Sequence, residues 1–115
     1  MRLSSGRACA VARPELPLLR DYYVLHAEET DLPLDARELD EMWLLALRIA
    51  RELALRHHGD PECYTLLASG ARTRRRPWPH FHIVPARSVA HKRWVLFLLW
   101  IKPLLLLLRG RAASR

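Results

Sequence analysis

The chain has little cysteine, with only Cys9 and Cys63 among its 115 residues. The two cysteines lie far apart, and their separation matches no spacing typical of a metal site or a redox pair. Reduced thiols are the simplest interpretation, and they indicate a cytoplasmic protein. We therefore expect no disulfide framework and no bound metal, and the sequence implies no cofactor.

A long uninterrupted apolar run is also missing. Residues 1–19 carry arginines and prolines among small residues, so we expect no signal peptide there. The apolar stretch 94–108 contains Lys102 and is shorter than the roughly 20 residues that cross a bilayer. We therefore expect no membrane-spanning segment and do not favour a membrane as the partner.

Positive charge and apolar residues are abundant. The hydrophobic fraction of 50% suits one modest domain rather than a disordered chain. The formal net charge is +7 and the isoelectric point is about 10.4. Such a balance favours anionic partners, namely nucleotides, nucleic acid or an acidic membrane surface, without choosing among them.

Patterns along the chain predict a single domain over residues 20–108. A loosely ordered lead-in, 1–19, precedes it, and a basic tail, 109–115, follows it. Within the domain, segments 21–27 and 63–68 are rich in aromatic and β-branched residues and are typical of strands. The sequence contains no internal repeats.

A long amphipathic helix is the clearest predicted element. Asp35, with Glu38 three positions later, forms a capping-box pattern at its start. Apolar residues then recur at helical spacing and form one face. They are Leu39, Met42, Trp43, Ala46, Ile49, Ala50 and Leu53. His57 and His58 suit the last turn and Gly59 its end, so we interpret the helix as a scaffold without chemistry.

A second, more apolar helix is predicted from Ser88, its N-cap, through residue 101, with Pro103 interrupting it. We expect this helix to cover the sheet or to make a dimer contact. The alternative is an interfacial membrane helix whose basic residues meet acidic headgroups. Those basic residues are Lys92, Arg93, Lys102 and Arg109.

The stretch 77–85 is where we expect chemistry. Successive side chains of a strand point to opposite faces, so four residues of this stretch would share one face. They are Trp78, His80, His82 and Val84. Phe81 and Ile83 would point the other way, into a core.

Two histidines on one strand face suit more than one role. One imidazole could attack phosphorus while its other nitrogen is held by a neighbour. The pair could instead bind a metal, with His26 or His91 as a third ligand. The third interpretation is that His80 and His82 are strand histidines without function.

Between segment 63–68 and the histidine strand lies a strongly basic stretch with four arginines in five residues. They are Arg72, Arg74, Arg75 and Arg76. Strand, loop and strand predict an antiparallel hairpin with a long connection, which would place the loop beside the histidine strand. The arginines could clamp phosphate oxygens or a nucleic-acid backbone, or form a solvated loop.

The order of these elements resembles the histidine-triad (HIT) superfamily. Strand 23–26, a long capped helix, strand 64–67, a loop and the string PHFHIVP carry the resemblance, which covers residues 21–87. It implies an α+β fold in which an antiparallel sheet packs on one long helix, followed here by a hydrophobic C-terminal helix.

The resemblance also implies a nucleotidyl hydrolase or transferase, in which the middle histidine of the motif attacks the α-phosphate. Counting forward from Tyr64 makes His80 the first histidine and His82 the nucleophile. Counting back from Pro85 puts Trp78 first and makes His80 the nucleophile. Ser69, Trp78 and the four arginines are then the residues expected to bind substrate.

The expected partner is a nucleotide or another phosphate-bearing ligand, with nucleic acid and a homodimer as further possibilities. The alternative function is a catalytically inactive HIT-like module that binds nucleic acid or an acidic membrane surface. Turnover of a nucleotide ester would separate the enzyme from the binding module.

Overall fold

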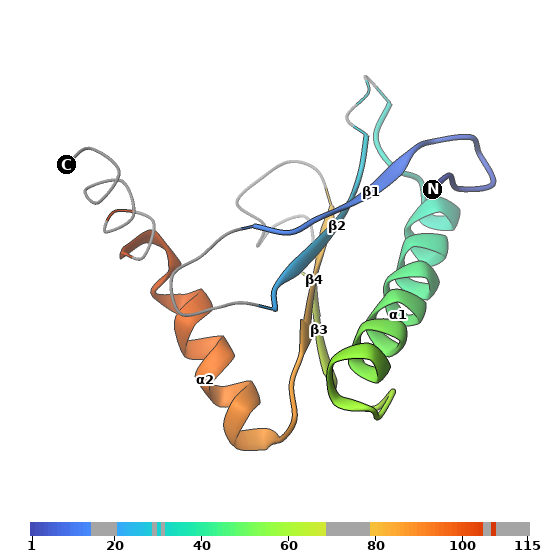
Figure 1. Ribbon diagram of the computed structural model, residues 1–115. Coiled ribbons are helices and arrows are strands. Elements are labelled where there is room, and N and C mark those ends of the chain that lie inside the picture. Colours follow the sequence, from blue (N-terminus) through green and yellow to red (C-terminus); the bar gives the residue numbers. More distant parts are fainter. Residues whose placement is uncertain (15–20, 29, 31, 69–78, 105–106, 108–115) are drawn as a thin grey trace.

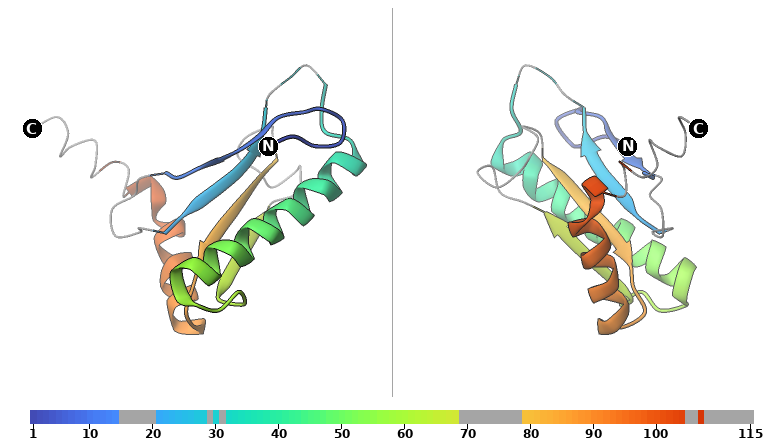
Figure 2. Two further views of the ribbon diagram at one scale, coloured as in Figure 1. Left: turned by 45° about the vertical axis from the view of Figure 1, so that its right-hand side comes forward. Right: turned by 90° about the vertical axis from the view of Figure 1, so that its left-hand side faces the viewer.

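The computed structural model describes residues 1–14, 21–28, 30, 32–68, 79–104 and 107 (Figure 1). Within them, four strands and two helices follow one another. They are β1 (Cys9–Ala12), β2 (Tyr23–Ala27), α1 (Ala36–His58), β3 (Tyr64–Ala68), β4 (His80–Pro85) and α2 (Val89–Trp100). The strands form one antiparallel sheet, and the two helices lie on opposite sides of it (Figure 2). The prediction of an α+β fold with an antiparallel sheet, a long helix and an apolar C-terminal helix is confirmed.

Strand β4 lies inside the sheet, whose order is β1-β2-β4-β3. β3 and β4 pair antiparallel, as predicted for the two strands that flank the basic loop. β2 pairs with β4 on its other side, and this register sets His26 opposite His80 and Val24 opposite His82. The histidine strand therefore has a neighbour on both edges, and its side chains are fixed on two defined faces.

The main core lies between the sheet and α1. Phe81 and Ile83 project from β4 into this core, as alternation along the strand predicts, and Leu25 joins them from β2. The helix meets them with residues of its apolar stripe. These are Met42, Ala46, Ala50 and Leu53. Two of them are alanines, so the backbone of the helix can approach the sheet closely.

Both ends of α1 follow the predicted capping chemistry. The carboxylate of Asp35 accepts a hydrogen bond from the amide of Glu38, and the Glu38 side chain accepts one from the amide of Asp35. At the other end Gly59 has φ of 73°, and its amide donates to the carbonyl of Leu55. A left-handed residue at this position satisfies a carbonyl that the helix would otherwise leave unpaired.

The N-terminal segment differs from the loosely ordered lead-in expected over residues 1–19. Its described part, 1–14, contributes strand β1 to the edge of the sheet and buries Leu3 and Cys9 in the α1-side core. Residues 15–19 lie outside the described residues. Small residues dominate β1 and carry no strand signal, so tertiary contacts rather than local propensity hold this strand.

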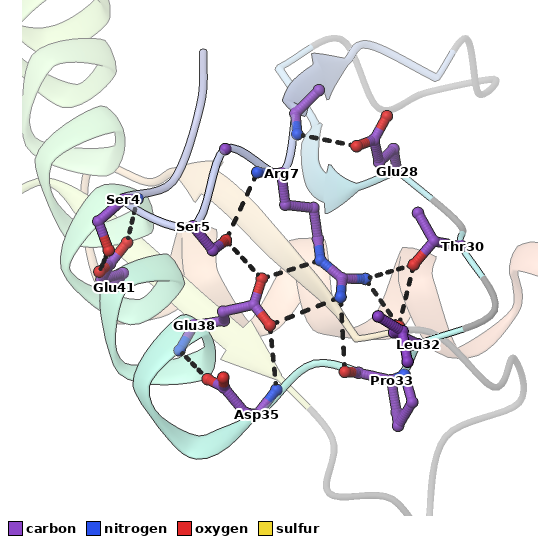
Figure 3. A network of polar contacts seen from close by, with 12 residues as sticks. Ser4, Ser5, Arg7, Glu28, Thr30, Leu32, Pro33, Asp35, Glu38 and Glu41 are labelled. Carbon is purple, nitrogen blue, oxygen red and sulfur yellow. Dashed lines mark hydrogen bonds and ion pairs between the residues drawn. The ribbon is translucent and has the colours of Figure 1, made fainter.

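An ion pair between Arg7 and Glu38 anchors this segment to α1 (Figure 3). Both side chains are almost fully buried, and Nε of Arg7 lies 2.9 Å from the Glu38 carboxylate. Arg7 also donates to the carbonyl of Leu32 at 3.0 Å and the hydroxyl of Thr30 at 3.2 Å. The Ser5 hydroxyl donates to Glu38 and, with the Asp35 amide and Arg7, lowers the pKa of that carboxyl.

Helix α2 covers part of the other face of the sheet. The Ser88 hydroxyl accepts from the amide of His91, which confirms the predicted N-cap, and α2 ends at Trp100, before Pro103. Val95 and Leu98 pack from the helix against Tyr22 and Val84 in a second, smaller core. The predicted basic tail, 109–115, lies outside the described residues.

Candidate histidine site

The two motif histidines lie on the α2 side of the sheet, opposite Phe81 and Ile83. Alternation along β4 predicts this placement, and the side chain of Val84 follows on the same face in the smaller core. The rings of His80 and His82 lie 4.8 Å apart at an interplanar angle of 77°. Both residues are half-buried. The structure thus brings together the pair that the motif singled out.

His82 is held by the hydroxyl of Tyr22, which is hydrogen-bonded to its Nδ1 atom. The two rings are stacked, with centroids 5.7 Å apart. Burial lowers the pKa of His82 to about 4, and the charges of His80 and Lys102 act in the same direction. Burial also raises the pKa of Tyr22 to about 12. At neutral pH both partners of this hydrogen bond are therefore uncharged.

The hydrogen bond to Tyr22 governs what Nε2 of His82 can do. If Nδ1–H donates to the tyrosine oxygen, Nε2 carries a lone pair and is a nucleophile or base. If the tyrosine hydroxyl donates to Nδ1, Nε2 carries the proton and is a donor. A change of tautomer would thus move a proton across the ring without placing a charge inside the protein.

Lys102 adds a positive charge next to this pair. Its ammonium group lies 5.6 Å from the centroid of the Tyr22 ring, and its charge contributes to the low pKa of His82. The sequence pattern around Lys102 and Tyr22 predicts no part for either residue in a histidine site. Tyr22 precedes Val24 by two positions and His26 by four, so alternation places all three on one face. Together with the β2–β4 register, this pattern would have indicated that Tyr22 lies on the face of the motif histidines.

The metal interpretation requires a third ligand near His80 and His82. Among the residues that it describes, no group of three or more His, Cys, Asp or Glu side chains is arranged to hold a metal ion. His26 lies across from His80 in the sheet but is exposed. His91 is at the start of α2, where its Nδ1 accepts the backbone amide of Arg87 at 3.0 Å.

A second group of histidines lies at the end of α1 and has a structural role. Nδ1 of His58 accepts from Nε of Arg87 at 3.2 Å, and the His58 and His91 rings meet edge to face. The Tyr23 hydroxyl is 2.9 Å from Nε2 of His57. These contacts connect the end of α1 to the start of α2 and to β2.

The predicted substrate-binding residues Arg72, Arg74, Arg75, Arg76, Ser69 and Trp78 all lie outside the described residues. The segment that contains them connects the end of β3 at Ala68 to the start of β4 at His80. In the sequence, three residues separate Arg76 from His80, the first residue of β4. Whether the arginines reach the imidazoles stays a prediction.

Comparisons with known proteins give no relative for this chain. No protein-family model matches it, and no curated protein sequence or solved structure matches it significantly. The α+β architecture and the histidine geometry therefore come from the structure alone. In the described part of the chain, no helix is both long and apolar enough to span a bilayer.

Proposed function

We propose that the protein is HIT-like and binds a nucleotide or another phosphate ester against the β2–β4 face. In this proposal His82 attacks phosphorus, and the enzyme is a nucleotidyl hydrolase or transferase. The observation that carries the proposal is the state of His82, a neutral imidazole held at Nδ1 by Tyr22. It lies beside a second histidine and the positive charge of Lys102.

Nucleophilic attack needs an imidazole nitrogen with a free lone pair. A pKa of about 4 keeps His82 deprotonated throughout the neutral range. With Nδ1–H donating to Tyr22, Nε2 forms a bond to phosphorus while the bond from phosphorus to the leaving oxygen or nitrogen breaks. Water then attacks the phosphorus atom of the intermediate, the bond from phosphorus to Nε2 breaks, and the nucleotide leaves while His82 is regenerated.

The surroundings favour His82 over His80 as the nucleophile. The Nδ1 atom of His82 is hydrogen-bonded to the hydroxyl of the buried Tyr22, which holds the ring in one orientation. In this proposal His80, at the start of β4, protonates the leaving group. This assignment follows the registry in which His80 is the first motif histidine, and it leaves Lys102 and the four arginines to balance the charge of the phosphate.

The test compares wild type with the His80→Ala/His82→Ala double variant on a nucleoside phosphoramidate and a dinucleoside polyphosphate. His91→Ala is the matched control, because it also removes a half-buried imidazole, but from α2 rather than from β4. Turnover that is lost in the double variant and kept in His91→Ala supports the enzyme. The proposal fails if wild type has no turnover.

A catalytically inactive HIT-like module that binds nucleic acid is the second candidate, and the net charge of +7 favours it. Binding to phosphate backbones releases counterions and therefore weakens steeply as salt rises. Salt-sensitive binding of single-stranded or double-stranded nucleic acid by wild type and double variant alike, without turnover, would select this candidate.

A further inference from the structure

Helix α2 exposes a row of large apolar side chains on the side away from the sheet. Phe97 is 47% exposed and Trp100 is 78% exposed, while Leu104 continues the row beyond the end of the helix. The ring of Phe97 contacts Trp94 on one side and Trp100 on the other, with centroids 5.9 and 6.4 Å apart. These rings form one continuous surface, which we call the aromatic row.

The packing of α2 against the sheet does not account for this row. Val95 and Leu98 fill the inner side of the helix and are buried against Tyr22 and Val84. A helix that is apolar on both sides is typically covered on both sides. Contiguous exposed apolar surface on a protein marks a contact with another molecule or a membrane. The sequence predicts that this helix covers the sheet, and in the described part of the chain the side chains on its outer side are exposed.

The charges around the aromatic row indicate what covers it. Lys92 and Arg93 are exposed on the first turns of α2, within a chain of net charge +7. A second copy docked through this face would bring like charges together, whereas an acidic bilayer attracts them. Tryptophan is enriched where a protein meets the headgroup layer, because its ring is apolar and its N–H is polar.

We propose that the aromatic row of α2 docks this protein on the surface of an acidic phospholipid bilayer. The helix lies in the plane of the membrane, with Phe97 and Trp100 at the boundary between headgroups and acyl chains and Lys92 and Arg93 against the headgroups. The apolar run is too short to span a bilayer, so the sequence does not favour a membrane partner and leaves an interfacial helix as the alternative. The exposure of the rings is a structural finding, and the inference does not depend on the histidine chemistry.

The first experiment measures co-sedimentation of the full chain with vesicles of phosphatidylcholine alone and of phosphatidylcholine mixed with phosphatidylserine. Wild type is expected to bind the mixed vesicles and to be released by salt. Phe97→Ser/Trp100→Ser should abolish binding. Leu44→Ser/Leu55→Ser is the matched control, since these leucines are 70% and 55% exposed on α1 and should be dispensable.

The second experiment tests the charges. Lys92→Glu/Arg93→Glu is expected to weaken binding to the mixed vesicles by roughly tenfold or more. Arg48→Glu/Arg56→Glu on α1 makes the same change in net charge and should weaken it much less. Equal losses in the two variants would show that only overall charge matters and would overturn the proposed orientation.

Sedimentation velocity without lipid tests the alternative that a second copy of the chain covers the aromatic row. A monomer whose vesicle binding follows the pattern above supports the membrane. The proposal is overturned by a dimer that Phe97→Ser/Trp100→Ser dissociates, or by wild-type protein that does not bind the mixed vesicles. Circular dichroism of each variant confirms that its helices are intact, and all four variants change only exposed positions.

Discussion

The hydroxyl of Tyr22 is hydrogen-bonded to Nδ1 of His82, and their rings lie parallel with centroids 5.7 Å apart. Tyr22 precedes β2, and His82 lies in the middle of β4. The Tyr22 side chain otherwise packs in the apolar cluster that joins the sheet to α2. One hydrogen bond therefore both satisfies a buried hydroxyl and orients the imidazole that we propose as nucleophile.

Replacing Tyr22 by Phe should destabilise the protein by about 1–2 kcal/mol, because Nδ1 of His82 loses its partner in a water-poor site. Urea denaturation at neutral pH measures the loss. Tyr23→Phe is the matched control, since the Tyr23 hydroxyl also binds a histidine, His57, but is only partly buried. Water can replace that partner, so the control should lose less. Equal losses of stability in the two variants would contradict the expectation that water replaces the hydroxyl of Tyr23 but not that of Tyr22.

The low pKa of His82 predicts a loss of stability in acid. The folded protein keeps His82 neutral down to pH of about 4, whereas the unfolded chain takes up a proton below about 6.5. Because only the unfolded chain binds this proton between pH 6.5 and 4, the free energy of unfolding falls as the pH drops through this range. Above pH 6.5 His82 is neutral in both states and causes no loss. The full shift corresponds to about 3 kcal/mol, which partial exposure of the ring reduces to about 1–2 kcal/mol.

Urea denaturation of wild type and His82→Gln at neutral pH and near pH 4 isolates this contribution. The other five histidines are present in both proteins, so their contributions cancel in the comparison. The variant should lose less stability on acidification than wild type does. A parallel decline in the two proteins would mean that His82 is protonated as readily when folded as when unfolded.

Local signals in the sequence predicted the elements that local chemistry controls. The capping box at Asp35 and the left-handed Gly59 fix the two ends of α1, and both are formed by residues within a few positions of each other. Alternation alone placed His80 and His82 on one face of β4 and Phe81 on the other. These predictions needed no knowledge of what lies across the sheet.

The contacts that the sequence did not predict join residues far apart in the chain. Arg7 pairs with Glu38 across 31 positions and Tyr22 with His82 across 60. No sequence pattern around Arg7 or Tyr22 identifies the residue that each contacts. β1 became identifiable only through such contacts, because its own residues have weak strand propensity. The pairing of β2 with β4 brings Tyr22 next to His82, and this contact makes Tyr22 part of the histidine site.

Gly59→Ala should destabilise the protein by about 1 kcal/mol. The residue has φ of 73°, and no atom lies within 4 Å of where a Cβ would be, so the cost is conformational rather than steric. Gly59→Asn should cost less, since asparagine tolerates this conformation. Thermal or urea denaturation distinguishes the three proteins. A loss for Asn that equals the loss for Ala would mean that the C-cap adopts another conformation.

Arg7→Gln should release β1 from the sheet edge before the rest of the fold is affected. The change leaves the nearly buried carboxylate of Glu38 without its cation and removes the hydrogen bonds to Thr30 and Leu32. Hydrogen exchange is expected to accelerate at the amides of β1, with little change in β3 and β4. Arg2→Gln removes an exposed arginine from the same segment and should leave β1 protected.

Lys102→Met should raise the pKa of His82, because the ammonium charge disfavours a second positive charge nearby. The pKa should stay below 6.5, since burial is the larger cause of the shift and is unchanged. NMR titration of the imidazole resonances measures the change, and Lys92→Met, on the exposed side of α2, should leave it unaltered. The same Lys102 variant should weaken phosphate binding if the histidine face takes a phosphate ester. A raised pKa with unchanged binding would assign Lys102 to tuning His82 rather than to holding the anion.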